Sequence, residues 1–473
     1  MQSIVQHLPE ILRAAAASQL GILALMVVAI AAIAHAFFRK SAEGWRMAAL
    51  ALLFAGCAGF GYAMFQQSAT RAAAQVVNVR ESLDRWLDEA GRARDAGTLS
   101  GASSLPSGLV DARNEFESRW RRAALPEKLA LPADAVASGL SLLNRLYREV
   151  EKDSPVQQAA NLWADEAIRH FDERQDPRRL TDALLDKAAI YLDLAQLGHD
   201  DRQQFEAMAR SGDALMARAF RTAAIDQQPQ VLRITSRFYY NLARPKSFRL
   251  SDTWDNTYLL LAYQKARAAH DLQPGELKNA NQLARTVIKV SRNPPQDTDP
   301  AWAENLRDAQ DGMAAAWSAA KAGLTGVEQR LSPLNVLGVV TLEAIAREWT
   351  AASPQERRAR AGRYLIELER DALPALREAA ALLQNSALRK AYGFDIHYDL
   401  ARAQALKTAL VRVTSAQAAR AEFKEVRSHL AVARENARTS QLEAALRDLG
   451  KDPSFSLLTP AERQGLAQLL NLG

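Results

Sequence analysis

The stretch Leu334-Asn-Val-Leu-Gly-Val-Val-Thr-Leu-Glu-Ala-Ile-Ala346 is the most apolar run in the part of the chain that follows residue 66. At about 13 residues it is too short to cross a bilayer as a helix. Its apolar side chains would occur all round a helix, which is typical of a helix that is buried on every side. The sequence therefore predicts a central, fully packed helix at this position.

Helix-start signals recur on both sides of this run. An N-cap residue, a proline and then a glutamine or glutamate occur together in Ser154-Pro155-Val156-Gln157, Ser353-Pro354-Gln355-Glu356 and Thr459-Pro460-Ala461-Glu462. Ser332-Pro333 is a partial version that predicts a further start. The commonest residues are strong helix formers, and strand-like runs are scarce. Because no fixed repeat is apparent, we predict an all-α fold with a large helical domain, either an irregular solenoid or a bundle.

The charge balance favours a mixed-charge surface over a nucleic-acid-binding face. Among 473 residues, 60 Lys and Arg are set against 54 Asp and Glu, which gives a net charge of +6. The two signs are mostly interspersed, whereas a nucleic-acid-binding protein would usually concentrate its positive charge on one face. The single cysteine, Cys57, excludes an intramolecular disulfide. We therefore predict no nucleic-acid partner and no cofactor or metal.

Two uncharged apolar runs near the N-terminus predict a transmembrane hairpin over 20–66, with helices at 20–38 and 46–65. Arg39, Lys40 and Arg46 cluster in the short connecting loop, and the positive-inside rule favours a cytoplasmic loop. The expectation is a two-pass protein of the inner or plasma membrane, with a large periplasmic or extracytoplasmic domain. Residues 1–19 would form a tail or an interfacial helix. A cleaved signal peptide ending near Ala34-His35-Ala36 is a less favoured reading.

Small residues in the second run predict a helix-packing face. Ala55 and Gly59 are four residues apart, as are Cys57 and Gly61, and this spacing lets two helices approach closely. The partner would be either the first helix of the hairpin or another molecule, including a second copy of the chain.

A stalk helix is expected over 67–97. Val76, Val79, Leu83 and Trp86 alternate by three and four residues, which is the pattern of a coiled-coil seam. This pattern allows a homo-oligomeric coiled coil, but it equally fits a helix that packs on its own domain, and we favour the second. A linker over 98–108, rich in Gly and Ser, follows. Beyond it we expect helical lobes at 109–292 and 293–473.

Few residues carry a chemical signal. The chain has no nucleotide-binding glycine motif, no H-E-x-x-H and no G-x-S-x-G. Glu166, His170 and Glu173 share a helix face, but such a set is more often a surface ion pair than a metal site. Asp395, His397 and Asp399 alternate at an expected helix start, where capping and local hydrogen bonds explain them. Neither set predicts a catalytic or metal site.

One basic cluster indicates a partner. Arg357, Arg358, Arg360 and Arg363 follow a predicted helix start, where positive charge opposes the helix dipole. A solvated helix face is the simpler explanation, but an anionic partner would also fit. The sequence as a whole favours a non-enzymatic, membrane-anchored helical scaffold or adaptor that binds a protein partner at a bacterial-type envelope. The alternatives are a membrane-bound sensor or regulator that binds a ligand in its helical domain, and an envelope enzyme without a recognisable motif.

Overall fold

The computed structural model describes residues 51, 55, 59, 62, 76–95, 106–149, 154–197, 201–244, 254–293, 302–384, 386 and 388–470. Within these ranges the secondary structure is helical, with turns between helices and no strand. The prediction of an all-α fold is therefore confirmed for the described part of the chain. The chain divides into two compact units, residues 1–146 and 147–473. The predicted lobe boundaries at 108 and 292 stay predictions.

In the first unit, a helix over 76–95 precedes the labelled helices, which are α4 (Ser107–Arg122), α5 (Leu125–Leu129) and α6 (Ala133–Glu149). Trp86 is fully buried, and its indole N–H donates to the backbone carbonyl of Gly139 on α6 at 3.2 Å. A Cβ on Gly139 would lie 2.5 Å from Cδ1 of Leu83. The helix over 76–95 thus packs closely on α6 because residue 139 has no side chain.

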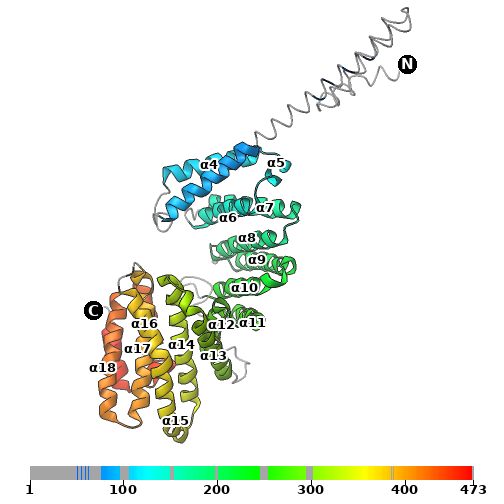
Figure 1. Cartoon of the computed structure of the whole chain (residues 1–473). Coiled ribbons are helices and arrows are strands. Elements are labelled where there is room, and N and C mark those ends of the chain that lie inside the picture. The colour runs from blue at the N-terminus through cyan, green and yellow to red at the C-terminus, as the bar shows by residue number, and fades with distance from the viewer. Residues whose placement is uncertain are drawn as a thin grey trace, which may run out of the picture. The chain divides into compact units, whose positions relative to one another are not determined.

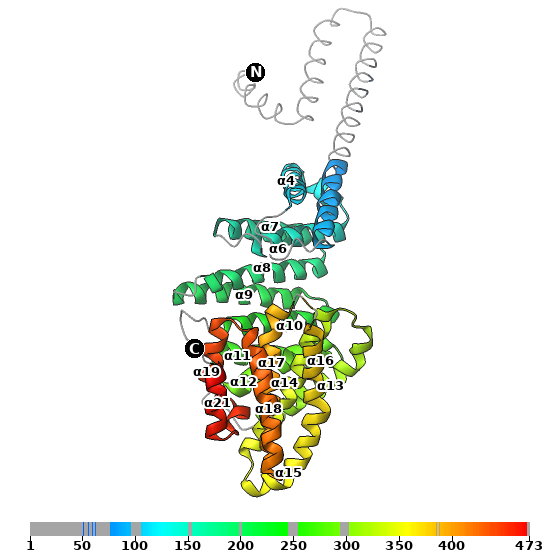
Figure 2. The same cartoon turned by 90° about the vertical axis from the view of Figure 1, so that its left-hand side faces the viewer.

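The second unit begins as a stack of helices in which each helix packs mainly on the next one or two along the chain (Figures 1 and 2). The helices of this stack are α7 (Ser154–Glu173), α8 (Pro177–Leu197), α9 (Arg202–Thr222), η1 (Ile225–Gln227), α10 (Gln228–Leu242), α11 (Asn256–Leu272), α12 (Leu277–Arg292), α13 (Trp302–Ala320) and η2 (Lys321–Gly323). Such contacts between successive elements are the packing of a solenoid. The predicted irregular solenoid describes this part of the unit well.

The rest of the second unit is a bundle around one long helix. Its elements are α14 (Val327–Ala351), α15 (Pro354–Glu367), the π-helical turn η3 (Leu368–Ala372), α16 (Leu373–Leu383), α17 (Arg389–Arg412), α18 (Ala416–Glu435), α19 (Thr439–Asp448), α20 (Pro453–Ser456) and α21 (Pro460–Leu470). Helices α12, α13, α16, α17 and α20 all contact α14. The bundle therefore closes the C-terminal end of the stack.

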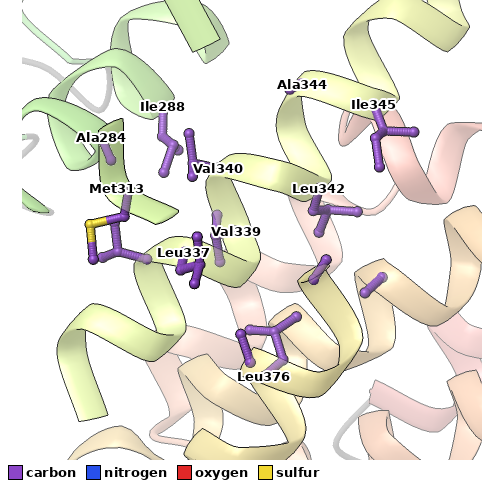
Figure 3. Close-up of a cluster of buried hydrophobic side chains, with 14 of the residues drawn as sticks. Ala284, Ile288, Met313, Leu337, Val339, Val340, Leu342, Ala344, Ile345 and Leu376 are labelled. Atoms are coloured by element: carbon purple, nitrogen blue, oxygen red, sulfur yellow. The ribbon is translucent and has the colours of Figure 1, made fainter. Parts of the chain in front are cut away.

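The central helix predicted over 334–346 is confirmed within α14. Except for Asn335, every residue from Leu334 to Ala346 is buried. Figure 3 shows why: Ile288 of α12 lies beside Val340 on one side of α14, and Leu376 of α16 lies on another. A Cβ on Gly338 would lie 2.5 Å from Cγ of Leu376, so α16 also approaches α14 at a glycine.

The predicted start at Ser332-Pro333 is wrong. The helix begins at Val327, and Pro333 lies inside it. Gly326 is the cap, and its backbone N–H donates to the side-chain carbonyl of Gln329 at 3.4 Å. Pro333 lies beyond the first turn, so its missing N–H removes one backbone hydrogen bond from the interior of α14. The starts at Ser353 and Thr459 are confirmed, since both side chains accept from the N–H of a glutamate three residues on, at 3.3 Å.

The membrane prediction needs correction. Among the described helices, none is long and apolar enough to cross a bilayer. The longest labelled helix, α14, has 25 residues but carries charged side chains near both ends, and its apolar run is short. A two-pass integral membrane protein with a periplasmic or extracytoplasmic domain is therefore not supported. The predicted spans at 20–38 and 46–65 lie outside the described residues, apart from Ala51, Ala55, Gly59 and Tyr62.

Candidate functional site

The residues predicted to form a stalk seam lie in the core of the first unit. Val79, Leu83 and Trp86 are 3%, 0% and 0% exposed, while Val76 is half-buried. Arg119 of α4 also donates to the backbone carbonyl of Asn78 at 2.7 Å. The buried side chains pack within their own unit, so they are not available to a second copy as a seam.

The predicted helix-packing face is only partly described. Ala55 and Gly59 are helical and exposed, and no described atom lies within 4 Å of a Cβ built on Gly59. Cys57 and Gly61 lie outside the described residues. This face stays a prediction.

The four predicted arginines lie on α15 and differ in what they do. Arg357 is half-buried, and it donates to the carbonyls of Trp349 and Thr350 at 2.8 Å, which satisfies acceptors at the end of α14. Arg358 is exposed. Arg360 and Arg363 form looser pairs, with Glu356 at 3.4 Å and Glu348 at 3.9 Å. One arginine is thus structural, and three present charge to solvent.

An apolar stripe runs beside these charges. Ala359, Gly362 and Ile366 are exposed on α15, and the side chain of Ile366 is 64% exposed. Nothing in the described structure lies within 4 Å of a Cβ on Gly362, so the surface there is open. Helix α15 lies at one end of the bundle (Figures 1 and 2). Arg358 and Arg363 flank this stripe, and we call these five residues the α15 face.

The two histidine–carboxylate sets do not assemble into sites. Glu166 pairs with Arg169, while the ring of His170 is buried against Phe171. His397 stacks on His429 at 5.9 Å between ring centroids, whereas Asp395 and Asp399 line a pocket. The described residues hold no group of three or more His, Cys, Asp and Glu side chains that could bind a metal.

The sequence reasoning missed a buried ionic cluster in the second unit. Arg402 of α17 has a fully buried side chain and pairs with Glu343 of α14, with Asp399 at 2.9 Å and with Asp452 at 2.6 Å. Arg292 of α12 also binds Glu343, with Nε to Oε1 at 2.9 Å. The cluster joins three helices to the cap of α20. One signal could have revealed it, namely Glu343 as the one charged residue in an otherwise apolar run.

Opposing effects act on the pKa of Glu343. Burial alone would raise it, but the positive charges of Arg292 and Arg402 and their hydrogen bonds lower it well below its usual range. Burial likewise opposes the charge of Arg402, but Asp452, Glu343 and Asp399 raise its pKa. Both groups are therefore charged near neutral pH.

Beside this cluster is a pocket of about 440 Å³, bounded by α12, α14, α17, α19 and residues at the end of α10. Its charged lining residues are Arg244, Arg285, Lys289, Arg292, Asp395 and Asp399. Arg285, Lys289 and Arg292 follow one face of α12 at a spacing of four and three residues. Tyr240, Phe394 and Tyr398 add aromatic surface. Cations thus gather on one wall of a partly apolar pocket.

The pocket shifts the pKa values of two of its charged groups. Desolvation, with the nearby charge of Arg292, lowers the pKa of Lys289 to about 8. Desolvation, with the charge of Asp399, raises the pKa of Asp395 to about 6. Asp395 is exposed as a whole residue, and it lines the pocket. In both groups burial is the largest cause of the shift, and it disfavours the charged form.

Comparison with known proteins adds little. The chain matches no protein-family model and no curated protein. A solved structure described as a "Circular tandem repeat protein with novel repeat topology and enhanced subunit contact surfaces" is similar over 84% of this chain and 95% of its own, with 14% sequence identity and a TM-score of 0.30. At that score the likeness supports no conclusion about topology or function.

Proposed function

We propose that the protein is a non-enzymatic helical scaffold that binds an acidic segment of a partner protein on the α15 face. The observation that carries this proposal is Ile366, whose side chain is 64% exposed beside uncovered arginines.

The charge of the α15 face supports an acidic partner. Arg358 is exposed, and the side chain of Arg363 is 68% exposed and pairs only loosely with Glu348, at 3.9 Å. Such an exposed ion pair contributes about 0–1 kcal/mol, so a carboxylate on a partner can compete for Arg363. Burying Ile366 at the same time would add an apolar contact at the centre of the interface.

The packing behind the α15 face supports a rigid binding surface. Tyr364 points inward, is fully buried and donates to Glu348 at 2.8 Å. Arg357 joins α15 to the end of α14 through the carbonyls of Trp349 and Thr350. A partner would therefore meet a pre-ordered helix and would lose little free energy to ordering it.

Photo-crosslinking in cells that express the full chain tests the proposal. A benzophenone amino acid replaces Ile366 in one variant and Ile225, which is 86% exposed on η1, in the control. We expect a discrete protein adduct at position 366 that is absent at position 225. No adduct at 366, or the same adduct at both positions, contradicts the proposal.

A further inference from the structure

We propose that the pocket bounded by α12, α14, α17 and α19 binds a small organic phosphate. This inference concerns a different part of the bundle from the α15 face and does not depend on a protein partner. The argument rests on which cations are already paired, on what else lines the pocket, and on its size.

The cations that line the pocket differ in whether they are already paired. Arg292 is held by Glu343, which also binds Arg402 in the buried cluster beside the pocket. By contrast, Lys289 and Arg285 form no ion pair with any described residue. Their recorded contacts are with aromatic rings: Lys289 lies 5.4 Å from the centroid of Trp254, and Arg285 lies 5.8 Å from that of Tyr240. An anion in the pocket would supply the missing charge partner.

The arrangement of these two cations suits a phosphoryl group. Arg285 and Lys289 are one helical turn apart on the same face of α12, so both can reach one anion. A guanidinium fork matches two phosphate oxygens, and an ammonium group binds as a point charge. Arg244 lines the same pocket and adds a third positive charge, which favours a dianion over a monoanion.

The remaining lining indicates an organic body. Apolar and aromatic groups, including Val336, Val339 and Phe394, face the pocket with the charges. Oδ1 of Asn335 is buried and has no hydrogen-bond partner among the described residues, so it can accept from a hydroxyl or amine of a ligand. The volume of about 440 Å³ is in the usual range for small-molecule pockets, about 300–1,000 Å³.

The position of the charged Lys289 side chain destabilises the folded protein, and this cost supports a role in binding. Partial burial and the charge of Arg292 both disfavour its charged form. Residues that destabilise a fold are often those that a binding site requires. A bound phosphate would place negative charge beside the ammonium group and offset that cost.

Isothermal titration calorimetry of the full chain with phenyl phosphate tests the inference, and benzoate and inorganic phosphate are the comparison probes. We expect phenyl phosphate to bind with a Kd below about 1 mM and both comparison probes to bind at least about tenfold more weakly. Lys289→Met and, separately, Arg285→Met should each weaken phenyl phosphate by about tenfold or more. Lys278→Met, an exposed lysine on the same helix, should bind like the wild type.

Several results would overturn the inference. They are no heat with phenyl phosphate up to about 10 mM, equal affinity in Lys289→Met, or benzoate binding as tightly as phenyl phosphate. If inorganic phosphate binds as tightly as phenyl phosphate, the pocket does not recognise the organic part of the ligand, and the inference of an organic phosphate is wrong. The thermal midpoint of Lys289→Met is the control for folding. We expect it to equal or exceed that of the wild type, in which case a loss of affinity does not result from unfolding. Arg358→Glu/Arg363→Glu should still bind phenyl phosphate, which separates this site from the α15 face.

Discussion

Arg402 and Glu343 form an ion pair in which neither side chain has any exposed surface. Arg402 also binds Asp399 and Asp452, so one guanidinium group connects α17, α14 and the cap of α20. A buried pair of this kind adds little net stability, but removing one partner leaves the other charges buried without compensation. Loss of either partner should therefore destabilise the bundle.

Replacing Arg402 with methionine should destabilise the second unit strongly. Glu343, Asp399 and Asp452 would lose their shared partner, and the expected cost is about 3–5 kcal/mol in the free energy of unfolding. Urea denaturation followed by circular dichroism measures it. Arg420→Met, an exposed arginine on α18, is the matched control and should change the free energy by less than about 0.5 kcal/mol. A similar small change for Arg402→Met would refute a structural role for the cluster.

The contact between Gly139 and Leu83 predicts a coupled pair of mutations in the first unit. Gly139→Ala should cost about 1–3 kcal/mol, because a Cβ there would lie 2.5 Å from Cδ1 of Leu83. Leu83→Ala should cost about 2–5 kcal/mol, since the side chain is fully buried. The double variant should cost less than the sum, because the smaller side chain leaves room for the new methyl group. Strict additivity in the denaturation data would show that the two positions do not touch.

The lowered pKa of Lys289 predicts how stability depends on pH. The unfolded chain holds this proton up to the ordinary pKa of 10.5, whereas the folded chain loses it near a pKa of about 8. Between these values the unfolded state binds more protons, so this lysine makes the wild type more stable as pH rises. Relative to Lys289→Met, the free energy of unfolding of the wild type should therefore increase from pH 8 to pH 10.

The groups that act on Lys289 come from several elements. Arg292 lies on its own helix, Asp399 and Arg402 lie on α17, and Glu343 lies on α14. Near pH 7, Lys289→Met should be at least as stable as the wild type, because it removes a desolvated charge. Thermal melts of both proteins across this pH range check the difference. A constant difference from pH 7 to pH 10 would mean that Lys289 titrates normally.

Asp395 should affect phosphate affinity in the opposite direction from Lys289. Its pKa is raised to about 6 by desolvation and by Asp399, but it is still mostly charged at pH 7.5 and repels an anion in the pocket. Asp395→Asn should therefore tighten phenyl phosphate binding several-fold at pH 7.5. The exposed Asp311→Asn on α13 should leave it unchanged. Weaker binding in Asp395→Asn would indicate that this carboxylate contacts the ligand directly.

The central helix could be predicted from the sequence, but its start could not. Leu334 to Ala346 is apolar on all sides, and only a buried helix satisfies that pattern. Ser332-Pro333 looked like a start because a serine cap followed by proline at the first helical position is a common helix-start signal. The cap at Gly326 depends on the side chain of Gln329, which is a weak sequence signal. The existence of this helix could thus be predicted from the sequence more reliably than the residue at which it begins.

The buried ionic cluster was not predicted, because its residues are far apart in the chain. Arg292, Arg402 and Asp452 each look like an ordinary surface charge in a mixed-charge sequence, and only Glu343 stands out, in its apolar run. Only the packing of α12, α14 and α17 brings them together. The basic cluster on α15 was visible because its arginines are close in sequence, but the inward role of Arg357 depends on where α14 ends.

The most direct test of the scaffold proposal is the affinity of the partner captured at position 366. The purified partner is titrated into the full chain, into Arg358→Glu/Arg363→Glu, and into Arg202→Glu/Arg210→Glu, a control pair on α9 with 81% and 70% exposed side chains. We predict that the α15 variant binds at least about tenfold more weakly and that the control binds like the wild type. Equal affinity in all three proteins would contradict the account.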